Sequence, residues 1–340
     1  MSEVTQQLDA TQQPELSQHN PAQRHLPVLA QRCIDLLAPA LQQPGSVLVD
    51  GTLGLGGHTE LALTQLPNVT VIGIDRDRQA LALASQRLAK FGARFIPVHA
   101  NYAEIADVVA AQGYPCVNGI LLDLGVSSMQ LDEAERGFSY IRDAQLDMRM
   151  DQTADLTAAD ILNTYGEAEI RDILFQFGEE RFSPRIAKQI VERRQIAPWQ
   201  RTGELAELVK NAIPKKAQLT GGHPAKRTFQ ALRIEVNREL TGLTEAIPDA
   251  LSVLAVEGRM VVESYQSLED RIVKQAFAQG LTSSAPTGLP VALPEYEPYL
   301  KAITRGAEKA DAKELELNSR AASVRLRGVM RISEQGANRK

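Results

Sequence analysis

Short apolar runs alternate with helical patterns over the first third of the chain. Runs rich in β-branched residues predict strands at 47–49, 69–74, 94–98 and 117–122. Apolar residues spaced three and four positions apart predict helices at 28–41, 61–66, 78–90 and 103–111. Strands and helices that alternate in this way are typical of an α/β protein with a doubly wound, mostly parallel sheet, which is the fold we predict.

The alternation stops after Leu124 and Gly125. Residues 131–223 then carry helical patterns and many charges, with neither a strand pattern nor a second glycine loop among them. Strand patterns return at 260–264 and 323–332. The simplest interpretation is an all-helical insertion that interrupts one sheet domain.

The segment after the insertion predicts further helices. Residues 228–254 have the pattern of a long amphipathic region, which we expect to break near Pro248 because proline lacks a backbone N–H. Ser267 takes the place of an N-cap, with Asp270 as the acid of a capping box. We predict a disordered N-terminal tail at 1–24 and a flexible C-terminal tail at 334–340. Between them lie a discontinuous sheet domain, at 25–127 and 228–333, and the helical insertion at 128–227.

Length and composition limit the class of protein. The 340 residues suffice for two domains or for one domain with a large insertion, and the net charge of −5 restricts any nucleic-acid contact to a local basic patch. Cys33 and Cys116 are isolated and the five histidines show no metal-ligand spacing, so we expect neither a disulfide scaffold nor a bound metal. No run reaches the roughly 20 apolar residues that span a bilayer. We therefore expect a soluble cytoplasmic protein without a membrane partner.

The sequence SVLVDGTLGLGGH at 46–58 predicts a ligand-binding turn. An apolar strand ends in Asp50, and closely spaced glycines, among them Gly54, Gly56 and Gly57, precede the next helix. Glycines let the backbone approach a ligand without interference from Cβ atoms. The start of the helix presents free N–H groups and about half an elementary charge to an anionic group. We interpret this stretch as a cofactor-binding loop.

Two features favour S-adenosylmethionine over a nicotinamide dinucleotide as the cofactor. A G-x-G-x-x-G fingerprint that begins at Gly54 fails because Thr59 occupies its third glycine position. Asp50 would repel a pyrophosphate but attract the ammonium group of a methionine moiety. Asp75 ends the second predicted strand, where an acid binds the ribose hydroxyls of either cofactor. A tight turn that binds no ligand is the alternative for the loop.

Asp123 ends the fourth predicted strand and is the candidate for the chemistry. The carboxyl edge of a doubly wound sheet borders the cofactor crevice. A carboxylate there can accept a hydrogen bond from an exocyclic amino group and orient its nitrogen toward the methyl donor. Alternatively, Asp123 caps the loop that follows it. Ser127 and Ser128 have the same ambiguity, since their hydroxyls can contact a substrate or cap a turn.

Charges divide the insertion into an acidic first half and a basic second half. The aromatic residues Phe182, Trp199 and Phe229 are interleaved with the basic residues. Such a segment can follow a phosphate backbone and stack bases, although two solvated helix faces of opposite charge also explain the pattern. The sequence therefore points to RNA or DNA as a partner to test.

Longer motifs cover most of residues 25–330. They read HLPVL (25–29), VDGTLGLGGH (49–58), GIDRD (73–77), GILLDLGVSSMQLDEAERGFS (119–139), LDMRMD (146–151), GEERFSPRIAKQIVERR (178–194), HPAKRTFQALRIEVNREL (223–240) and SLEDRIVK (267–274). In these motifs the chain resembles the bacterial RsmH/MraW family, which methylates the N4 amino group of a cytosine in the decoding region of 16S ribosomal RNA.

This resemblance implies a fold, a partner and roles for individual residues. The fold would be a class I, Rossmann-like methyltransferase domain dependent on S-adenosylmethionine, with a helical substrate domain inserted. The partner would be 16S ribosomal RNA within the small subunit or its precursor, and a homodimer stays open. The cofactor contacts would be Gly56, Gly57, His58, Asp75, Tyr102, Asp123 and Gln130, to which the loop analysis adds Asp50 and Gly54. We expect RNA contacts at Arg181, Arg185, Arg227, Phe229 and Arg233, and catalytic roles for Asp123, Ser127 and Gln266.

The chain departs from the family pattern at one catalytic candidate. Where the family commonly reads SFHSLEDR, this chain reads SYQSLEDR, with Tyr265 and Gln266. Gln266 can orient an amino group or a phosphate but does not titrate near neutral pH, so we expect activity that does not depend on a histidine there. Glu263 also replaces a residue that is usually uncharged, and the sequence offers no physical account of it.

Two other functions stay open from the sequence. A DNA amino-methyltransferase would share the fold, but such enzymes usually show a DPPY-like strand end, and the sequence Asp123-Leu124-Gly125 lacks both prolines. A noncatalytic RNA-binding factor in ribosome assembly would keep the cofactor fold without transferring a methyl group.

Overall fold

A sheet of seven strands forms the centre of the protein in the computed structural model, which describes residues 27–218, 222–283, 285 and 296–334. The strands are β1 (Val47–Asp50), β2 (Thr70–Asp75), β3 (Phe95–His99), β4 (Val117–Asp123), β5 (Leu254–Ser264), β6 (Leu300–Ala302) and β7 (Arg325–Arg331). Their order is β3-β2-β1-β4-β5-β7-β6; β7 is antiparallel to β5 and β6, and the other pairings are parallel. The predicted doubly wound, mostly parallel α/β fold is confirmed.

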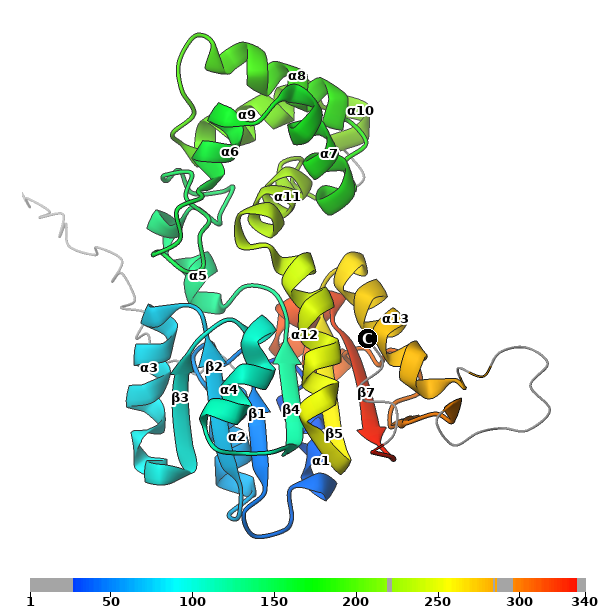
Figure 1. Ribbon diagram of the computed structural model, residues 1–340. Coiled ribbons are helices and arrows are strands. Elements are labelled where there is room, and N and C mark those ends of the chain that lie inside the picture. Colours follow the sequence, from blue (N-terminus) through cyan, green and yellow to red (C-terminus); the bar gives the residue numbers. More distant parts are fainter. Residues whose placement is uncertain (1–26, 219–221, 284, 286–295, 335–340) are drawn as a thin grey trace, which may run out of the picture.

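Helices cover both faces of this sheet (Figure 1). One face packs against α1 (Ala30–Leu37), α2 (Gly57–Gln65) and α3 (Arg78–Leu88), and the other against α4 (Ile105–Ala111), α12 (Glu239–Val253) and α13 (Ser267–Leu281). β1, β2 and β4 are apolar throughout their centres because both faces are buried, which is typical of parallel strands. Across the described helices, none combines the length and the hydropathy that crossing a bilayer requires.

A second core lies beyond the carboxyl edge of the sheet, in the upper part of Figure 1. It is built by α6 (Ala158–Thr164), α7 (Glu167–Gly178), α8 (Ser183–Arg194), α9 (Thr202–Ala212) and α11 (Lys226–Asn237). The short helices α5 (Ser128–Asp132), α10 (Lys215–Gln218) and α14 (Ala312–Leu317) complete the described helices outside the 3-10 turns. The helical pattern expected for 131–223 is therefore present.

The division into domains stays a prediction, but the packing places α11 with the helical core, whereas the sequence boundary at 227/228 assigned it to the sheet domain. The predicted N-terminal tail lies outside the described residues, and of the predicted C-terminal tail only Glu334 is described.

Two local predictions were wrong. The break in the region 228–254 falls at Arg238, which adopts φ 49° between α11 and α12, while Pro248 lies inside α12. The left-handed conformation of Arg238 ends α11, whereas α12 continues through Pro248 despite the hydrogen bond that a proline removes and the kink that it favours. The cap of α13 also begins one residue earlier than predicted. Glu269 accepts hydrogen bonds from the N–H groups of Tyr265 and Gln266, and Asp270 instead pairs with two arginines of β7.

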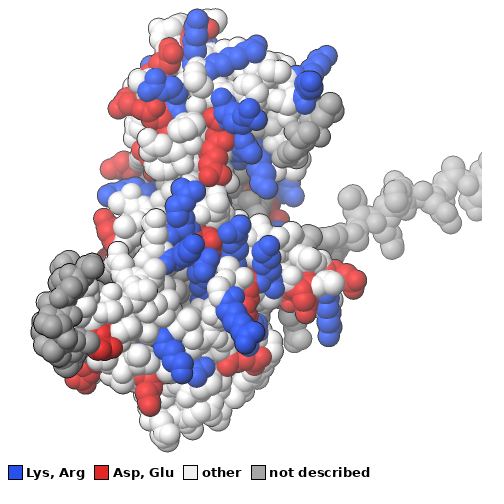
Figure 2. Space-filling view, turned by 90° about the vertical axis from the view of Figure 1, so that its right-hand side faces the viewer, with Lys and Arg blue, Asp and Glu red and all other residues white. Residues whose placement is uncertain are grey.

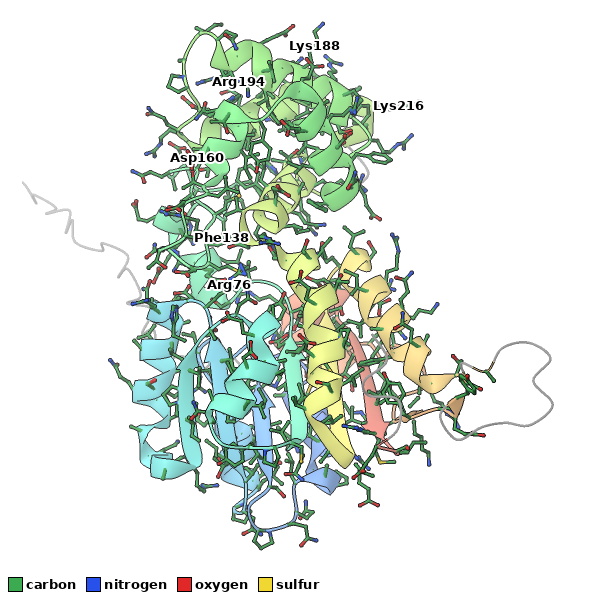
Figure 3. All side chains as sticks on the ribbon, in the orientation of Figure 1. Arg76, Phe138, Asp160, Lys188, Arg194 and Lys216 are labelled. Atoms are coloured by element: carbon green, nitrogen blue, oxygen red, sulfur yellow. The ribbon has the colours of Figure 1, made fainter. Side chains whose placement is uncertain are left out.

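Buried polar groups join the helical core to the sheet. Both terminal nitrogens of Arg76, which follows β2, donate to the carbonyl of Asn237 at the end of α11. The Asn237 side chain donates to the Met148 carbonyl at 2.7 Å and accepts from the Met150 N–H at 2.8 Å. Figure 3 places Arg76 at this junction. Because an unpaired buried polar group destabilises a fold, these bonds favour one orientation of the two parts.

The close approach of α7 and α11 predicts the effect of a small substitution. A Cβ atom at Gly178 would lie 2.6 Å from the Arg227 carbonyl oxygen. We expect Gly178→Ala to lower the free energy of unfolding by about 1–3 kcal/mol, because backbone atoms must move apart. Gly242→Ala in α12 is the matched control, since its Cβ would meet no atom closer than 3.9 Å. It should raise the free energy of unfolding by about 0.4–1 kcal/mol. Urea unfolding measured by circular dichroism checks both, and equal midpoints would contradict the packing argument.

Candidate functional site

The glycine loop between β1 and α2 is shaped for close approach. Gly56 adopts φ 75°, which few other residues tolerate, and a Cβ at Gly51 would lie 2.5 Å from Leu122 Cδ2. α2 begins at Gly57, four residues before the predicted start at 61, so the glycine pair itself forms the helix start. The first N–H groups of a helix lack partners within it. The loop thus offers the anion-binding helix start that the sequence predicts.

Both strand-end acids of this loop hold its backbone. The Asp75 carboxylate accepts hydrogen bonds from the N–H groups of Gly54 at 2.7 Å and Asp77 at 2.8 Å. Burial raises the pKa of Asp75 to about 6, even though these two bonds lower it. Asp50 is 1% exposed and accepts from the Thr59 hydroxyl at 2.7 Å, and burial raises its pKa as well. Asp75 is therefore half-buried at the loop, whereas the Asp50 carboxylate is fully buried.

A group of ionisable side chains converges at the ends of β4 and β5. Asp123 and Glu263 are paired in the register of these strands. The His58 Nε2 atom lies 3.5 Å from Asp123 Oδ2 and 3.4 Å from Glu263 Oε2. The Tyr265 hydroxyl donates to Asp123 Oδ1 at 2.8 Å. His58 and Glu263 are buried, whereas the Asp123 side chain is 26% exposed, so Asp123 is the member that reaches the surface.

The protonation of this group follows from its burial and its charges. Burial opposes a charge on His58, but Asp123 and Glu263 outweigh it and raise the pKa of His58 from 6.5 to about 9. Burial, followed by the charge of Asp123, raises the pKa of Glu263 well above its usual range. Burial also raises the pKa of the Tyr265 phenol, which therefore stays protonated and donates its hydrogen bond.

A narrow cavity at this edge lies between the sheet and the helical core. It is lined by Thr52, Arg76, Tyr102, Leu124, Gly125, Met150, Glu239, Leu243 and Glu269. The Tyr102 hydroxyl donates to the Glu239 carbonyl at 3.1 Å, which fixes the ring that we expect to contact the adenine. The cavity thus brings Tyr102 together with the loops that follow β1 and β4.

The predicted residues Ser127 and Gln130 form a helix cap. The Ser127 hydroxyl accepts from the Gln130 backbone N–H at 3.3 Å, and the side-chain Oε1 of Gln130 accepts from the Ser127 backbone N–H at 3.0 Å. The Gln130 amide also donates to Asp77 at 3.0 Å, and Asp77 forms a buried ion pair with Arg136 at 2.7 Å. This geometry matches the capping alternative for Ser127, so we do not carry it forward as a catalytic group.

Gln266 lies at the start of α13. Its amide nitrogen donates to Glu269 at 2.9 Å, while its amide oxygen has no hydrogen-bond partner within the described part of the chain. Burial raises the pKa of Glu269. Gln266 therefore keeps one acceptor atom, held in place by Glu269, close to the end of β5.

The predicted RNA contacts divide into exposed and buried residues. Arg181, Arg185 and Arg227 are exposed, and Arg227 also donates to the Glu179 carbonyl at 3.0 Å. Figure 2 shows Lys and Arg side chains along the face on which α7, α10 and α13 lie. Phe229 is 3% exposed inside the helical core, and Arg233 forms a bidentate ion pair with Glu239 at 2.8 Å. We carry only the three exposed arginines forward.

Sequence reasoning missed several members of the site. Glu263 joins His58 and Asp123, and Tyr265 orients Asp123, but no role was assigned to either residue. The available signal was an acid within the apolar run MVVES, which parallel pairing with β4 places beside Asp123. Cys33 of α1 also reaches this group, and no spacing in the sequence indicates that contact.

The chain is similar in sequence to known proteins over most of its length. Residues 22–332 match the sequence profile of a family described as the MraW methylase family. The Ribosomal RNA small subunit methyltransferase H of Beutenbergia cavernae is 62% identical over 308 residues, which cover 91% of this chain and 92% of that protein. The protein of the same name from Kocuria rhizophila is 57% identical over 312 residues, 92% of this chain and 95% of that protein. Among solved structures, an rRNA methylase from Streptococcus thermophilus aligns with 13% identity and a TM-score of 0.40, covering 88% of this chain and 93% of that one.

The raised pKa of Asp75 predicts a pH dependence of stability. The folded-state pKa of about 6 exceeds the usual 3.8, so the folded protein binds a proton at Asp75 more tightly than the unfolded chain does. The stability that Asp75 contributes to the free energy of unfolding is therefore fully present below pH 3.8 and is lost as the pH rises through 6. Asp75→Asn should remove that loss, so the variant should gain at most about 3 kcal/mol relative to the parent between pH 4 and pH 7. Urea unfolding at several pH values measures this difference. Asp107→Asn, at an exposed position, is the control, and identical pH profiles for the parent and Asp75→Asn would contradict the assignment.

Proposed function

The chain belongs to the MraW methylase family, and on that premise we propose that it transfers a methyl group from S-adenosylmethionine to the N4 amino group of a cytosine in the decoding region of 16S ribosomal RNA. The observation that carries the proposal is Asp123, partly exposed at the carboxyl end of β4 and oriented by Tyr265 and His58 beside the glycine loop. The curated relatives named above are small-subunit ribosomal RNA methyltransferases, which supports the choice of acceptor.

The residues at the glycine loop fit the cofactor. The start of α2 suits the methionine carboxylate, because the first N–H groups of the helix, from Gly57 and His58 onward, have no partner within it. Asp75 suits the ribose hydroxyls, and Tyr102 offers a fixed ring for the adenine. When bound, S-adenosylmethionine supplies a methyl group that its positive sulfur has already activated. The protein then has to exclude water and align the acceptor.

Asp123 has the position of the acceptor-orienting group. Its Oδ1 receives the Tyr265 hydroxyl and its Oδ2 faces His58, so the carboxylate is held in one orientation. A carboxylate held in this way accepts a hydrogen bond from an amino group and aims the nitrogen lone pair, and alignment alone accounts for a large part of catalysis. The amide oxygen of Gln266 is buried without a hydrogen-bond partner among the described residues, and it becomes a second acceptor when the side chain turns toward the substrate. No histidine is needed at that position, because the amino nitrogen loses its proton readily after methylation.

The helical core and the exposed arginines serve the RNA in this proposal. Arg181, Arg185 and Arg227 can neutralise backbone phosphates, which supplies affinity but no sequence discrimination. The target cytosine must leave its stack to reach Asp123, which costs a few kcal/mol. The substrate is 16S ribosomal RNA in the small subunit or its precursor, and the protein acts in the cytoplasm, where ribosomes are assembled. We do not propose the homodimer that the sequence left open.

Labelled methyl transfer separates this proposal from the two alternatives. The purified protein is incubated with methyl-labelled S-adenosylmethionine and small subunits from cells that lack the modification. We expect label that ribonuclease releases and deoxyribonuclease does not. Label on added DNA would favour the DNA amino-methyltransferase. Cofactor binding without transfer to any RNA, measured by calorimetry, would favour the noncatalytic assembly factor and contradict our proposal.

Asp123→Asn tests the orienting role directly. The amide keeps the size of the side chain but loses the charge and one acceptor atom. We expect kcat to fall by at least about 100-fold, because a misdirected amino group rarely reaches attack geometry. Calorimetric cofactor affinity, measured in parallel, separates this effect from a contact with the cofactor. Asp107→Asn is the exposed control, and a kcat for Asp123→Asn within a factor of three of the parent would remove Asp123 from catalysis.

The exposed arginines predict a salt-dependent affinity. Arg181→Gln with Arg185→Gln should weaken binding to small subunits and reduce the slope of log K against log salt by about 2, one for each phosphate contact. The kcat at saturating substrate should stay the same, because neither residue is hydrogen-bonded or ion-paired to Asp123 in the described structure. Lys301→Gln, on the edge strand β6, is the control. An unchanged salt slope in the double variant would show that these arginines do not contact phosphates.

A further inference from the structure

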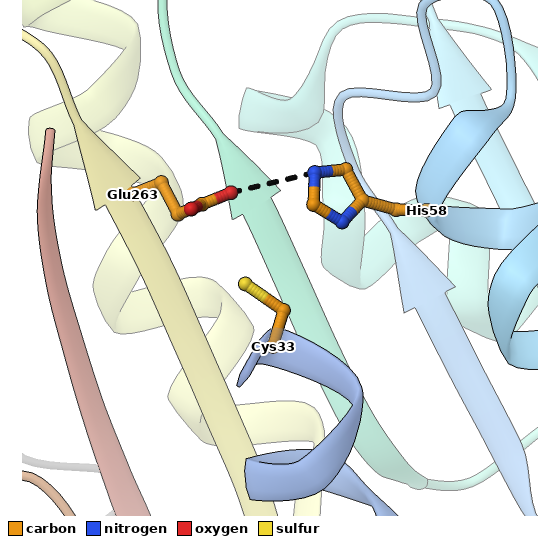
Figure 4. Close-up of side chains that lie close together, drawn as sticks. All are labelled: Cys33, His58 and Glu263. Carbon is orange, nitrogen blue, oxygen red and sulfur yellow. Dashed lines mark ion pairs between the residues drawn. The ribbon is translucent and has the colours of Figure 1, made fainter. Parts of the chain in front are cut away.

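Three buried side chains of different chemistry meet beneath the candidate site. They are Cys33 of α1, His58 of α2 and Glu263 of β5, and one ligand atom of each lies within 4.8 Å of those of the other two. Figure 4 shows the thiol, the imidazole and the carboxylate pointing toward one another from their separate elements. The exposed fraction is 0% for Cys33, 5% for His58 and 0% for Glu263. The sequence predicted no metal site, because these residues are far apart along the chain.

Hydrogen bonds do not satisfy the polar atoms of this cluster, and the contact between His58 Nε2 and Glu263 Oε2, at 3.4 Å, is an ion pair. Neither ring nitrogen of His58 and neither carboxylate oxygen of Glu263 makes a hydrogen bond to any residue that the structure describes. Such groups destabilise a protein interior unless something satisfies them. The neighbouring acids Asp50 and Asp123 increase the negative charge around His58.

We propose that Cys33, His58 and Glu263 bind one Zn²⁺ ion. Zn²⁺ bonds of about 2.0–2.3 Å place tetrahedral ligand atoms about 3.3–3.7 Å apart. Atoms that already lie within 4.8 Å of one another need only small side-chain rotations to reach that geometry. Asp123 Oδ2, 3.5 Å from His58 Nε2, is the protein atom available as a fourth ligand, and a water molecule is the other choice.

The chemistry of the donors selects the class of metal. A thiolate and an imidazole favour Zn²⁺ over Mg²⁺ or Ca²⁺, which prefer oxygen ligands. Cys33 and Cys116 are both free cysteines, and only Cys33 is buried. The Cys33 thiol is therefore available as a ligand. A bound divalent ion would satisfy the polar atoms of this cluster and join α1, α2 and β5. Its role is structural, and the inference does not rest on the proposed methyl transfer.

Metal content of the full-length, untagged protein tests the proposal. After dialysis against metal-free buffer, we expect inductively coupled plasma mass spectrometry to find about one zinc per chain. Cys33→Ser should retain less than about a tenth of that amount, and Cys116→Ser, the matched control at an exposed position, should retain all of it. Less than about a tenth of a zinc per parent chain, even after incubation with added Zn²⁺, would overturn the proposal. Equal zinc in Cys33→Ser and the parent would also overturn it.

Cobalt substitution keeps the test decisive if Cys33→Ser fails to fold. Co²⁺ bound to a thiolate gives a ligand-to-metal charge-transfer absorption in the near ultraviolet. We expect this absorption in the parent and in Cys116→Ser, and a changed visible spectrum in Glu263→Gln, which keeps the size of the side chain. Circular dichroism confirms that each variant is folded. A parent protein that takes up Co²⁺ without the thiolate absorption would exclude Cys33 as a ligand and contradict the proposed site.

Discussion

The parallel register of β4 and β5 places Asp123 directly beside Glu263 at the carboxyl edge of the sheet, and the rest of the site depends on that pairing. Two neighbouring carboxylates are unfavourable unless positive charge or protons compensate. His58 supplies this compensation from the start of α2, and Tyr265 fixes the outer oxygen of Asp123. The position of the glycine loop relative to the reactive edge is therefore set by electrostatics as well as by strand packing.

Most of the fold followed from local patterns, because buried parallel strands and amphipathic helices leave periodic traces in a sequence. The failures occurred where a single residue decided the backbone. Arg238 adopts a left-handed conformation that residue type does not indicate. The N-cap of α13 is Gln266 rather than Ser267, so Glu269 and not Asp270 accepts the backbone N–H groups at the start of the helix. The apolar pattern of α11 runs on into α12 along the sequence, yet the apolar face of α11 packs in the helical core.

The candidate site was predictable only in part. Strand ends indicated Asp75 and Asp123, since the carboxyl edge of such a sheet is where ligands bind. Side chains that meet across the sheet gave no comparable signal: Cys33, Tyr265 and Glu263 are separated from His58 along the chain, and their contacts depend on register and helix placement. The sequence also did not show which residues are exposed. Phe229 and Arg233 fit an RNA-binding pattern, but Phe229 is buried in the helical core and Arg233 is ion-paired with Glu239.

The nucleoside product tests the central claim most directly. Small subunits from cells lacking this activity are treated with the protein and S-adenosylmethionine, and the 16S ribosomal RNA is digested and analysed by mass spectrometry. The account predicts one new modified nucleoside, N4-methylcytidine, within a fragment from the decoding region. A methyl group on another atom or base, or no new nucleoside when the cofactor is shown to bind, would contradict it.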